Sequence, residues 1–159
     1  MRNTSSALAI ARVQKIKFRT PQKSLIILAS NIEMITRYVE KIPDIAVDLI
    51  ETYEKPLTIV YDKARNLPKN LVSDDGSIAI RIPRYEFCLQ LITELGKPIT
   101  STSANISGEP TAHSFNKINQ TVKDAVDYIC TTDQQMVNAP KPSTIIRVYE
   151  SGHMQILRS

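Results

Sequence analysis

The segment 101–108 carries the side chains best suited to chemistry. It reads Ser-Thr-Ser-Ala-Asn-Ile-Ser-Gly and follows a short apolar run that begins at Pro98. Serine and threonine offer rotatable donors, asparagine offers a donor and an acceptor, and Gly108 allows close backbone approach, which suits phosphate or carboxylate oxygens. A turn whose side chains bond only their own backbone has similar residues. Composition alone leaves both interpretations open.

Two cations, Lys17 and Arg19, stand just before Pro21. Proline disfavours helical geometry at Thr20, so a helix ends here and both side chains project from an irregular segment. Alternate residues of an extended segment point to the same side, and two such cations could clamp a polyphosphate. The alternative is the solvated face of a basic helix end.

Other polar residues carry weaker signals. An inward-pointing Arg81, between Ile80 and Ile82 in an apolar strand, would need an anion, although an edge strand or a structural carboxylate pair explains it equally well. Ser143 fits an ordinary strand start, and Arg158 alone carries no signal. The two histidines, His113 and His153, lack the neighbours of a metal site or catalytic triad, so we expect no metal ligands.

Chain length and composition indicate a single domain, 1–159. Of its 159 residues 42% are hydrophobic, and the net charge of +4 permits but does not require a polyanionic partner. We expect Cys88 and Cys130 to be buried thiols in a reducing compartment. The apolar run at 7–11 is too short for a signal sequence or a membrane span. We therefore expect a cytoplasmic protein without membrane contact.

Strand-length apolar runs alternate with capped amphipathic segments, which is typical of an α/β fold. Asn31 and Ser114 are candidate helix caps, Gly96 a helix end, and Glu150–His153 a hairpin turn. The runs predict strands over 25–28, 57–61, 77–82, 98–102, 128–130, 144–149 and 154–157. The periodic segments predict helices over 7–17, 32–42, 44–53, 85–95 and 115–122.

The order of several short motifs resembles the YrdC-like threonylcarbamoyl-AMP synthase family. The motifs are Lys17-Phe18-Arg19, Pro56-Leu57-Thr58, Ala79-Ile80-Arg81-Ile82-Pro83, Ser103-Ala104-Asn105-Ile106-Ser107-Gly108, Ser143-Thr144-Ile145 and Ile156-Leu157-Arg158. The resemblance spans nearly the whole chain. It implies a YrdC/RibB-like α/β fold, in which a twisted mixed sheet with flanking helices forms a concave basic cavity.

The resemblance also implies an activity, the synthesis of threonylcarbamoyl-AMP from ATP, L-threonine and bicarbonate for tRNA modification. ATP is then a substrate, Mg²⁺ bridges its phosphates, and downstream threonylcarbamoyl transferase proteins take the product. The implied catalytic residues are Lys17, Arg19, Ser103 and Asn105. The implied ATP-binding residues are Arg19, Lys23, Ala79, Asn105, His113 and Arg158, and the implied substrate-binding residues are Arg81, Ser103 and Ser143.

One departure from the family pattern concerns threonine. Family members usually carry a Pro-Thr-(Asp/Glu)-Thr-x-Tyr-Gly-Leu loop ahead of the Lys-x-Arg motif, and this sequence has Met1–Ser6 there instead. We therefore expect a domain truncated at its N-terminus and impaired in synthesis. The alternative function is a non-catalytic module that binds double-stranded RNA or tRNA, for which the dispersed cations Lys15, Lys23, Lys117 and Lys123 would suffice.

Overall fold

A six-stranded mixed sheet forms the centre of the molecule. The computed structural model describes residues 7–19, 25–131 and 142–159. The strand order is β4-β1-β3-β2-β5-β6; β1 and β3 run parallel, as do β2 and β5, and the other neighbouring pairs are antiparallel. The strands are β1 (Ile26–Leu28), β2 (Leu57–Tyr61), β3 (Ile78–Arg81), β4 (Ile99–Ser101), β5 (Thr144–Val148) and β6 (Met154–Arg158). The predicted mixed α/β sheet is confirmed.

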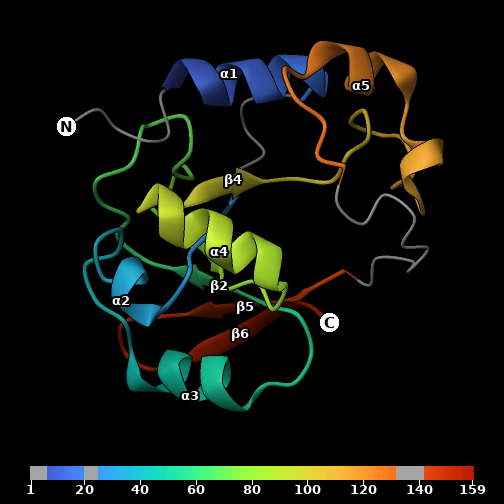
Figure 1. The fold of residues 1–159 in the computed structure, drawn as a ribbon. Coiled ribbons are helices and arrows are strands. Elements are labelled where there is room, and N and C mark those ends of the chain that lie inside the picture. Colours follow the sequence, from blue (N-terminus) through green and yellow to red (C-terminus); the bar gives the residue numbers. More distant parts are fainter. Residues whose placement is uncertain (1–6, 20–24, 132–141) are drawn as a thin grey trace.

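One helix precedes the first strand, and the others fall between strands in the chain (Figure 1). They are α1 (Ala7–Ile16), α2 (Ile32–Ile35), α3 (Asp44–Thr52), α4 (Glu86–Leu95) and α5 (Gln120–Ala125), with a 3-10 turn η1 (Phe115–Lys117) before α5. Figure 1 shows α1 and α5 side by side, and Arg12 of α1 pairs with Asp127 just after α5 at 2.7 Å. None of the described helices is long and apolar enough to cross a bilayer.

The strand register divides the sheet residues between two faces. Ile27, Ile59 and Ile80 are cross-strand partners and all are at most 2% exposed, so one face carries the apolar core. Its buried members on the sheet are Ile27, Ile59, Tyr61, Ile78, Ile80, Ile146 and Val148. The other face carries Ile26, Val60, Ala79, Arg81, Ser101 and Ile145, and Arg81 is the charged side chain of β3 on it.

Three predicted elements differ in the structure. The helix expected over 32–42 begins, as predicted, with the Asn31 side chain accepting from the Met34 amide, but it ends at Ile35. Beyond it the backbone pairs with a distant loop: the Arg65 amide donates to the Tyr38 carbonyl, and Val39 bridges Ala64. Long-range pairing therefore replaces the helical hydrogen bonds.

The other two differences lie between residues 114 and 130. Ser114 makes no side-chain cap bond, and the expected helix 115–122 divides into η1 and α5, with the Asn119 side chain capping α5 through the Thr121 amide. The strand expected over 128–130 does not form, and Tyr128 is 78% exposed. Without a neighbouring strand, an apolar run has no partner for its backbone groups.

The hairpin at the C-terminal end agrees with the prediction. The Tyr149 amide donates to the His153 carbonyl at 2.9 Å, and Gly152 has the positive φ of 83° that the turn requires. The hairpin places Arg158 of β6 beside Ser143, which precedes β5. Two residues that are 15 positions apart thus meet at one end of the sheet.

Candidate functional site

A cavity of about 610 Å³ opens on the polar face of the sheet. The guanidinium side chains of Arg19, Arg81 and Arg158 line it, together with hydroxyl groups and a floor of small and apolar side chains. The hydroxyl residues are Ser101, Thr102, Ser103, Thr111 and Ser143, and the floor contains Leu25, Ile26, Val60, Ala79, Ile145 and Leu157. No carboxylate is among the described residues that line it.

Arg81 is the central cation of this cavity. It ends β3 on the same face as Ala79, and among the described residues no carboxylate pairs with it. Removal from water lowers the pKa of the Arg81 guanidinium, although the nearby Cys88 acts in the opposite direction. A half-buried guanidinium remains charged at neutral pH, so it favours an anion from outside the protein.

The Ser143 hydroxyl occupies a buried position at the other side of the cavity. It lies 2.9 Å from the Thr58 hydroxyl, and both residues are at most 4% exposed. Arg158 donates to the Ser143 carbonyl through Nε at 3.1 Å and Nη2 at 2.8 Å. These contacts fix the guanidinium of Arg158 at the cavity wall and leave its remaining N–H groups available.

Lys17 and Arg19 diverge at the end of α1. The Arg19 amide donates to the Gln14 carbonyl and the Phe18 amide to the Lys15 carbonyl, which is the Schellman pattern of a helix C-terminus. Phe18 takes the left-handed conformation, with φ 48°, at the position where glycine is usual. This turn directs Lys17 inward while Arg19 reaches the cavity.

The Lys17 ammonium is buried against the backbone of the serine-rich segment. It donates to the Asn105 carbonyl at 2.6 Å and to the Ser103 carbonyl, and its own carbonyl accepts from the Ser107 amide at 2.8 Å. Lys17 is only 4% exposed, and no carboxylate pairs with it among the described residues. Burial, and then the charge of Arg19, lower the pKa of Lys17.

Asn105 is held within the same segment. Its side-chain amide donates to the Glu109 carbonyl at 2.7 Å, while its Oδ1 is buried without a hydrogen-bond partner among the described residues. Gly108 follows with a positive φ of 92°, as expected of a glycine that permits a tight turn. Segment 103–108 is therefore a loop organised around Lys17, with Ser103 at the cavity edge.

The remaining predicted site residues are distributed as follows. Ala79 lines the cavity, whereas His113 is exposed and does not line it, although Thr111 two residues earlier does. Lys23 lies outside the described residues. The sequence reasoning missed Thr111 and Thr58. Thr58 pairs with Ile145 of β5 and lies on the same face of the sheet as Ala79, and no local sequence pattern could predict this long-range pairing.

The cavity offers no ready site for a metal ion. In the described part of the chain, no three His, Cys, Asp or Glu residues come together to hold one. Carboxylate and carbonyl oxygens are the ligands that Mg²⁺ prefers, and the described lining has only neutral hydroxyls and cations.

The two cysteines are half-buried, not fully buried as expected. Cys88 is on α4, and burial raises the pKa of its thiol, which keeps it protonated at neutral pH. This thiol has no evident chemical role in the cavity.

Comparison with known proteins agrees with this geometry. The profile of the Sua5/YciO/YrdC family, described as "Telomere recombination", matches residues 2–159. A threonylcarbamoyl-AMP synthase of Pseudoalteromonas translucida is 34% identical over 140 residues, which cover 86% of this chain and 74% of the relative. A threonylcarbamoyl-AMP synthase of Pyrococcus abyssi is 29% identical over 143 residues, 89% of this chain and 42% of the relative.

Solved structures show the same fold. A double-alanine variant of P. abyssi Sua5 superposes with a TM-score of 0.83 at 28% identity, over 94% of this chain and 45% of that one. P. abyssi Sua5 complexed with L-threonine gives 0.78 at 26% identity, over 92% of this chain and 43% of that one. This chain therefore spans less than half of each Sua5 chain. The family profile over nearly all residues and the shared fold lead to one conclusion: the chain belongs to the Sua5/YciO/YrdC family.

Proposed function

We propose that this chain is a threonylcarbamoyl-AMP synthase whose nucleotide lies in the arginine-lined cavity. The observation that carries the proposal is the lining itself, in which three guanidinium groups and five hydroxyl residues occur without a carboxylate among the described residues. Such a surface favours a polyanion. The relatives named threonylcarbamoyl-AMP synthase and the threonine complex of Sua5 support ATP and L-threonine as substrates.

The reaction forms one bond and breaks one bond at phosphorus. The L-threonine amine and bicarbonate form an N-carboxylated threonine with release of water, and the new carboxylate oxygen attacks the α-phosphate of ATP. The bond between the α-phosphorus and its bridging oxygen breaks, and pyrophosphate leaves with the electron pair. The product is threonylcarbamoyl-AMP, which downstream threonylcarbamoyl transferase proteins would use for tRNA modification in the cytoplasm.

The residues of the cavity supply charge and orientation for this step. Arg19, Arg81 and Arg158 would neutralise the phosphates, and the Ser103 and Ser143 side would bind the substrate. The attacking oxygen is already a carboxylate, so the chemistry needs alignment with the α-phosphate more than a general base. Lys17 contributes by holding the loop that carries Ser103 and Asn105, through their carbonyl oxygens.

Arg81→Gln tests the nucleotide site. It removes the central cation, and we expect ATP affinity to fall by roughly tenfold to a hundredfold, the range for a charge-assisted hydrogen bond. Calorimetry with ATP and Mg²⁺ measures this directly. The matched control is Arg37→Gln, because Arg37 is an exposed arginine whose ion pair with Glu33 spans 3.5 Å. Equal ATP affinity in both variants would contradict the site.

A pyrophosphate-release assay with ATP, L-threonine, bicarbonate and Mg²⁺ tests the reaction. Threonine-dependent release that falls in Arg81→Gln but persists in Arg37→Gln would support synthesis. ATP binding without any release would support the nucleotide site and contradict synthesis by this chain alone. The two measurements therefore separate binding from turnover.

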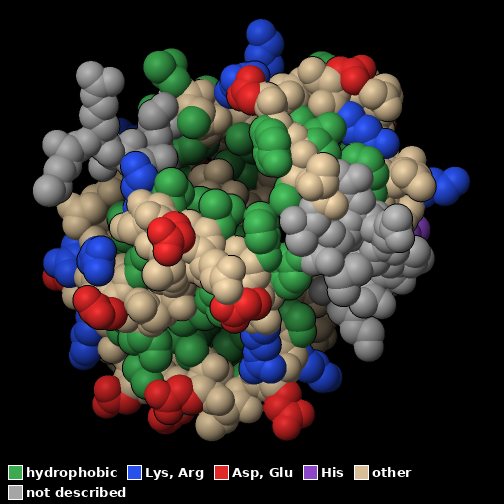
Figure 2. Space-filling model, viewed as in Figure 1, with side chains coloured by type: hydrophobic (Ala, Val, Ile, Leu, Met, Phe, Trp, Pro, Cys, Tyr) green, Lys and Arg blue, Asp and Glu red, His purple; other side chains and the backbone are tan. Residues whose placement is uncertain are grey.

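The alternative function, binding of double-stranded RNA or tRNA, relies on cations outside the cavity. Lys15 and Lys117 are exposed, and the partly buried Lys123 lies over the Phe115 ring at 4.8 Å from its centroid. Lysine and arginine side chains are spread around the periphery of the face in Figure 2, while hydrophobic side chains gather around α4. Steeply salt-dependent RNA binding that Lys15→Gln and Lys117→Gln weaken, but Arg81→Gln does not, would favour this alternative.

A further inference from the structure

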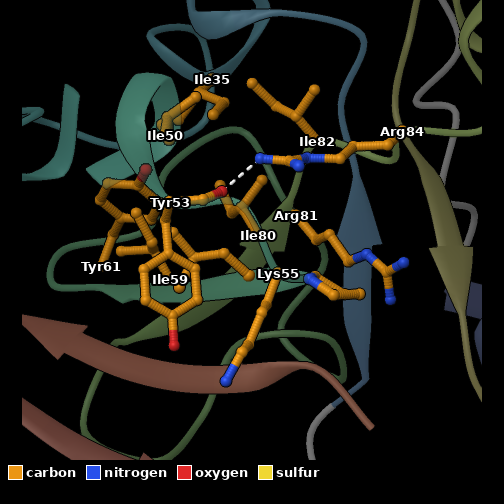
Figure 3. Close-up of a pocket in the computed structure, with 12 residues that line it drawn as sticks. Ile35, Ile50, Tyr53, Lys55, Ile59, Tyr61, Ile80, Arg81, Ile82 and Arg84 are labelled. Carbon is orange, nitrogen blue, oxygen red and sulfur yellow. Dashed lines mark hydrogen bonds between the residues drawn. The ribbon is translucent and has the colours of Figure 1, made fainter. Parts of the chain in front are cut away.

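A second cavity, of about 190 Å³, lies mainly on the core face of the sheet, and Arg81 at the end of β3 lines both this cavity and the arginine-lined one. Five isoleucines line it: Ile35 from α2, Ile50 from α3, Ile59 and Ile80 from the sheet, and Ile82 after β3. Figure 3 shows them arranged around a common space together with Tyr53 and Tyr61. An apolar cavity that is larger than one water molecule loses packing energy unless something fills it.

The wall of this cavity contains an unpaired hydroxyl group. Tyr61 is 1% exposed, and its hydroxyl has no hydrogen-bond partner among the described residues. In Figure 3 its ring extends from β2 toward Ile50 of α3. Burial raises the pKa of Tyr61 far above its ordinary value, so the hydroxyl stays protonated at neutral pH. A buried O–H donor without an acceptor favours a ligand that supplies one.

The mouth of the cavity carries a fixed cation. Arg84 donates through Nη1 to the Glu54 carbonyl and through Nη2 to the Tyr53 carbonyl, and no carboxylate pairs with it among the described residues. Figure 3 shows this guanidinium reaching across to Tyr53, whereas Lys55 and Arg81 extend away from Ile50. Backbone contacts therefore hold a charge at the mouth and leave three of its five N–H donors available.

We propose that this cavity is a binding site for a small aliphatic carboxylate. The apolar walls accept a hydrocarbon chain, Arg84 binds the carboxylate at the mouth, and the Tyr61 hydroxyl would donate to an oxygen near the far end of the chain. An apolar cavity of about 150 Å³ accommodates benzene, so this one accommodates a chain of about five or six carbons. The ligand would contact Ile80, whose side chain lies on the opposite face of β3 from Ala79 of the nucleotide cavity. Among the described residues, Arg81 alone lines both cavities.

Hexanoate is a suitable probe, and isoleucine methyl NMR distinguishes the two cavities. We expect hexanoate to produce saturable shifts at the methyl groups of Ile50, Ile80 and Ile82, and ATP to shift Ile26 and Ile145 instead. Hexanol, which has the same chain without the charge, should bind about tenfold more weakly. Absence of saturable shifts with hexanoate, or equal binding of hexanol, would overturn the proposal.

Three variants locate the probe. Ile50→Phe should fill the cavity and abolish the hexanoate shifts in a protein that still shows its ATP-dependent shifts. Arg84→Gln should weaken hexanoate binding about tenfold, while the matched Arg37→Gln should not. Tyr61→Phe should not lower the melting temperature, because the hydroxyl has no partner to lose, and it should not weaken binding of hexanoate, which carries no acceptor at its inner end. Unchanged hexanoate affinity in folded Ile50→Phe would show that the probe binds elsewhere and overturn the assignment.

Discussion

The ammonium group of Lys17 lies 2.6 Å from the carbonyl oxygen of Asn105, and it donates to the Ser103 carbonyl as well. One buried cation therefore holds both polar residues of the Ser-x-Asn sequence through their backbone. This arrangement makes Lys17 a positioning residue for loop 103–108. It also explains why the loop needs a long basic side chain at the end of α1, where a shorter donor could not reach both carbonyls.

Lys17→Met should loosen loop 103–108 and weaken ATP binding. Methionine keeps much of the side-chain volume but cannot donate to the two carbonyls, and we expect a loss of about 1–3 kcal/mol in the free energy of unfolding. Lys15→Met is the matched control, because Lys15 is exposed near the same helix end. Urea unfolding and amide exchange at Ser107 measure the effect. Equal stability of the two variants would contradict the positioning role.

The lowered pKa of Lys17 predicts a pH dependence of stability. Between the lowered native pKa and the ordinary lysine pKa of 10.5, the unfolded state binds a proton that the native state lacks, so the contribution of Lys17 to stability rises with pH in this window. Below the native pKa the burial penalty is fully present. Tyr61 acts oppositely at higher pH, because its pKa is raised and the unfolded state loses its proton first.

The measurement is a comparison of unfolding free energies for the native protein and Lys17→Met as the pH is raised toward 10.5. The difference between the two proteins cancels the contribution of Tyr61. We expect the native protein to gain relative to the variant with rising pH. A difference that stays constant or falls would show that the Lys17 ammonium is not penalised by burial.

Local patterns predicted some parts of this structure and could not predict others. Strands β2 and β3 follow directly from their apolar runs, and the Asn31 cap follows from its residue type, because both signals are local. The end of α2 depends on pairing of residues 38–40 with 63–65, which only the folded chain brings together. Long-range contacts override local propensity in such places.

The candidate site shows the same division. The residue types of Lys17, Arg19 and Ser103 predicted an anion site, and the structure places Arg19 and Ser103 at one cavity. Alternation in an extended segment predicts that Lys17 and Arg19 project to the same side. The sequence therefore could not indicate that Lys17 contacts carbonyl oxygens. The left-handed conformation of Phe18 separates the two side chains.

The buried hydroxyl pair of Thr58 and Ser143 should show coupled energetics. Thr58→Val or Ser143→Ala each leaves one buried hydroxyl without its 2.9 Å partner, at a cost of about 1–2 kcal/mol. The double variant removes both groups, so it should cost about 1 kcal/mol less than the sum of the single changes. Urea unfolding of all four proteins tests this. Strict additivity would show that the two hydroxyls do not interact.

Phe18→Gly should stabilise the protein. Phe18 has φ 48° at the end of α1, a conformation that costs a non-glycine residue about 1–2 kcal/mol. Glycine removes this strain but loses about 0.5–1 kcal/mol of backbone entropy, which leaves a net gain of about 0.5–1 kcal/mol. Phe18 is 68% exposed, so the lost side chain gives up little burial.

The matched control is Lys15→Gly in the last helical turn, which should destabilise by about 1 kcal/mol because that position is helical. Thermal unfolding of the two variants should therefore give shifts of opposite sign, and a loss of stability in Phe18→Gly would mean that the phenyl ring makes contacts worth more than the strain.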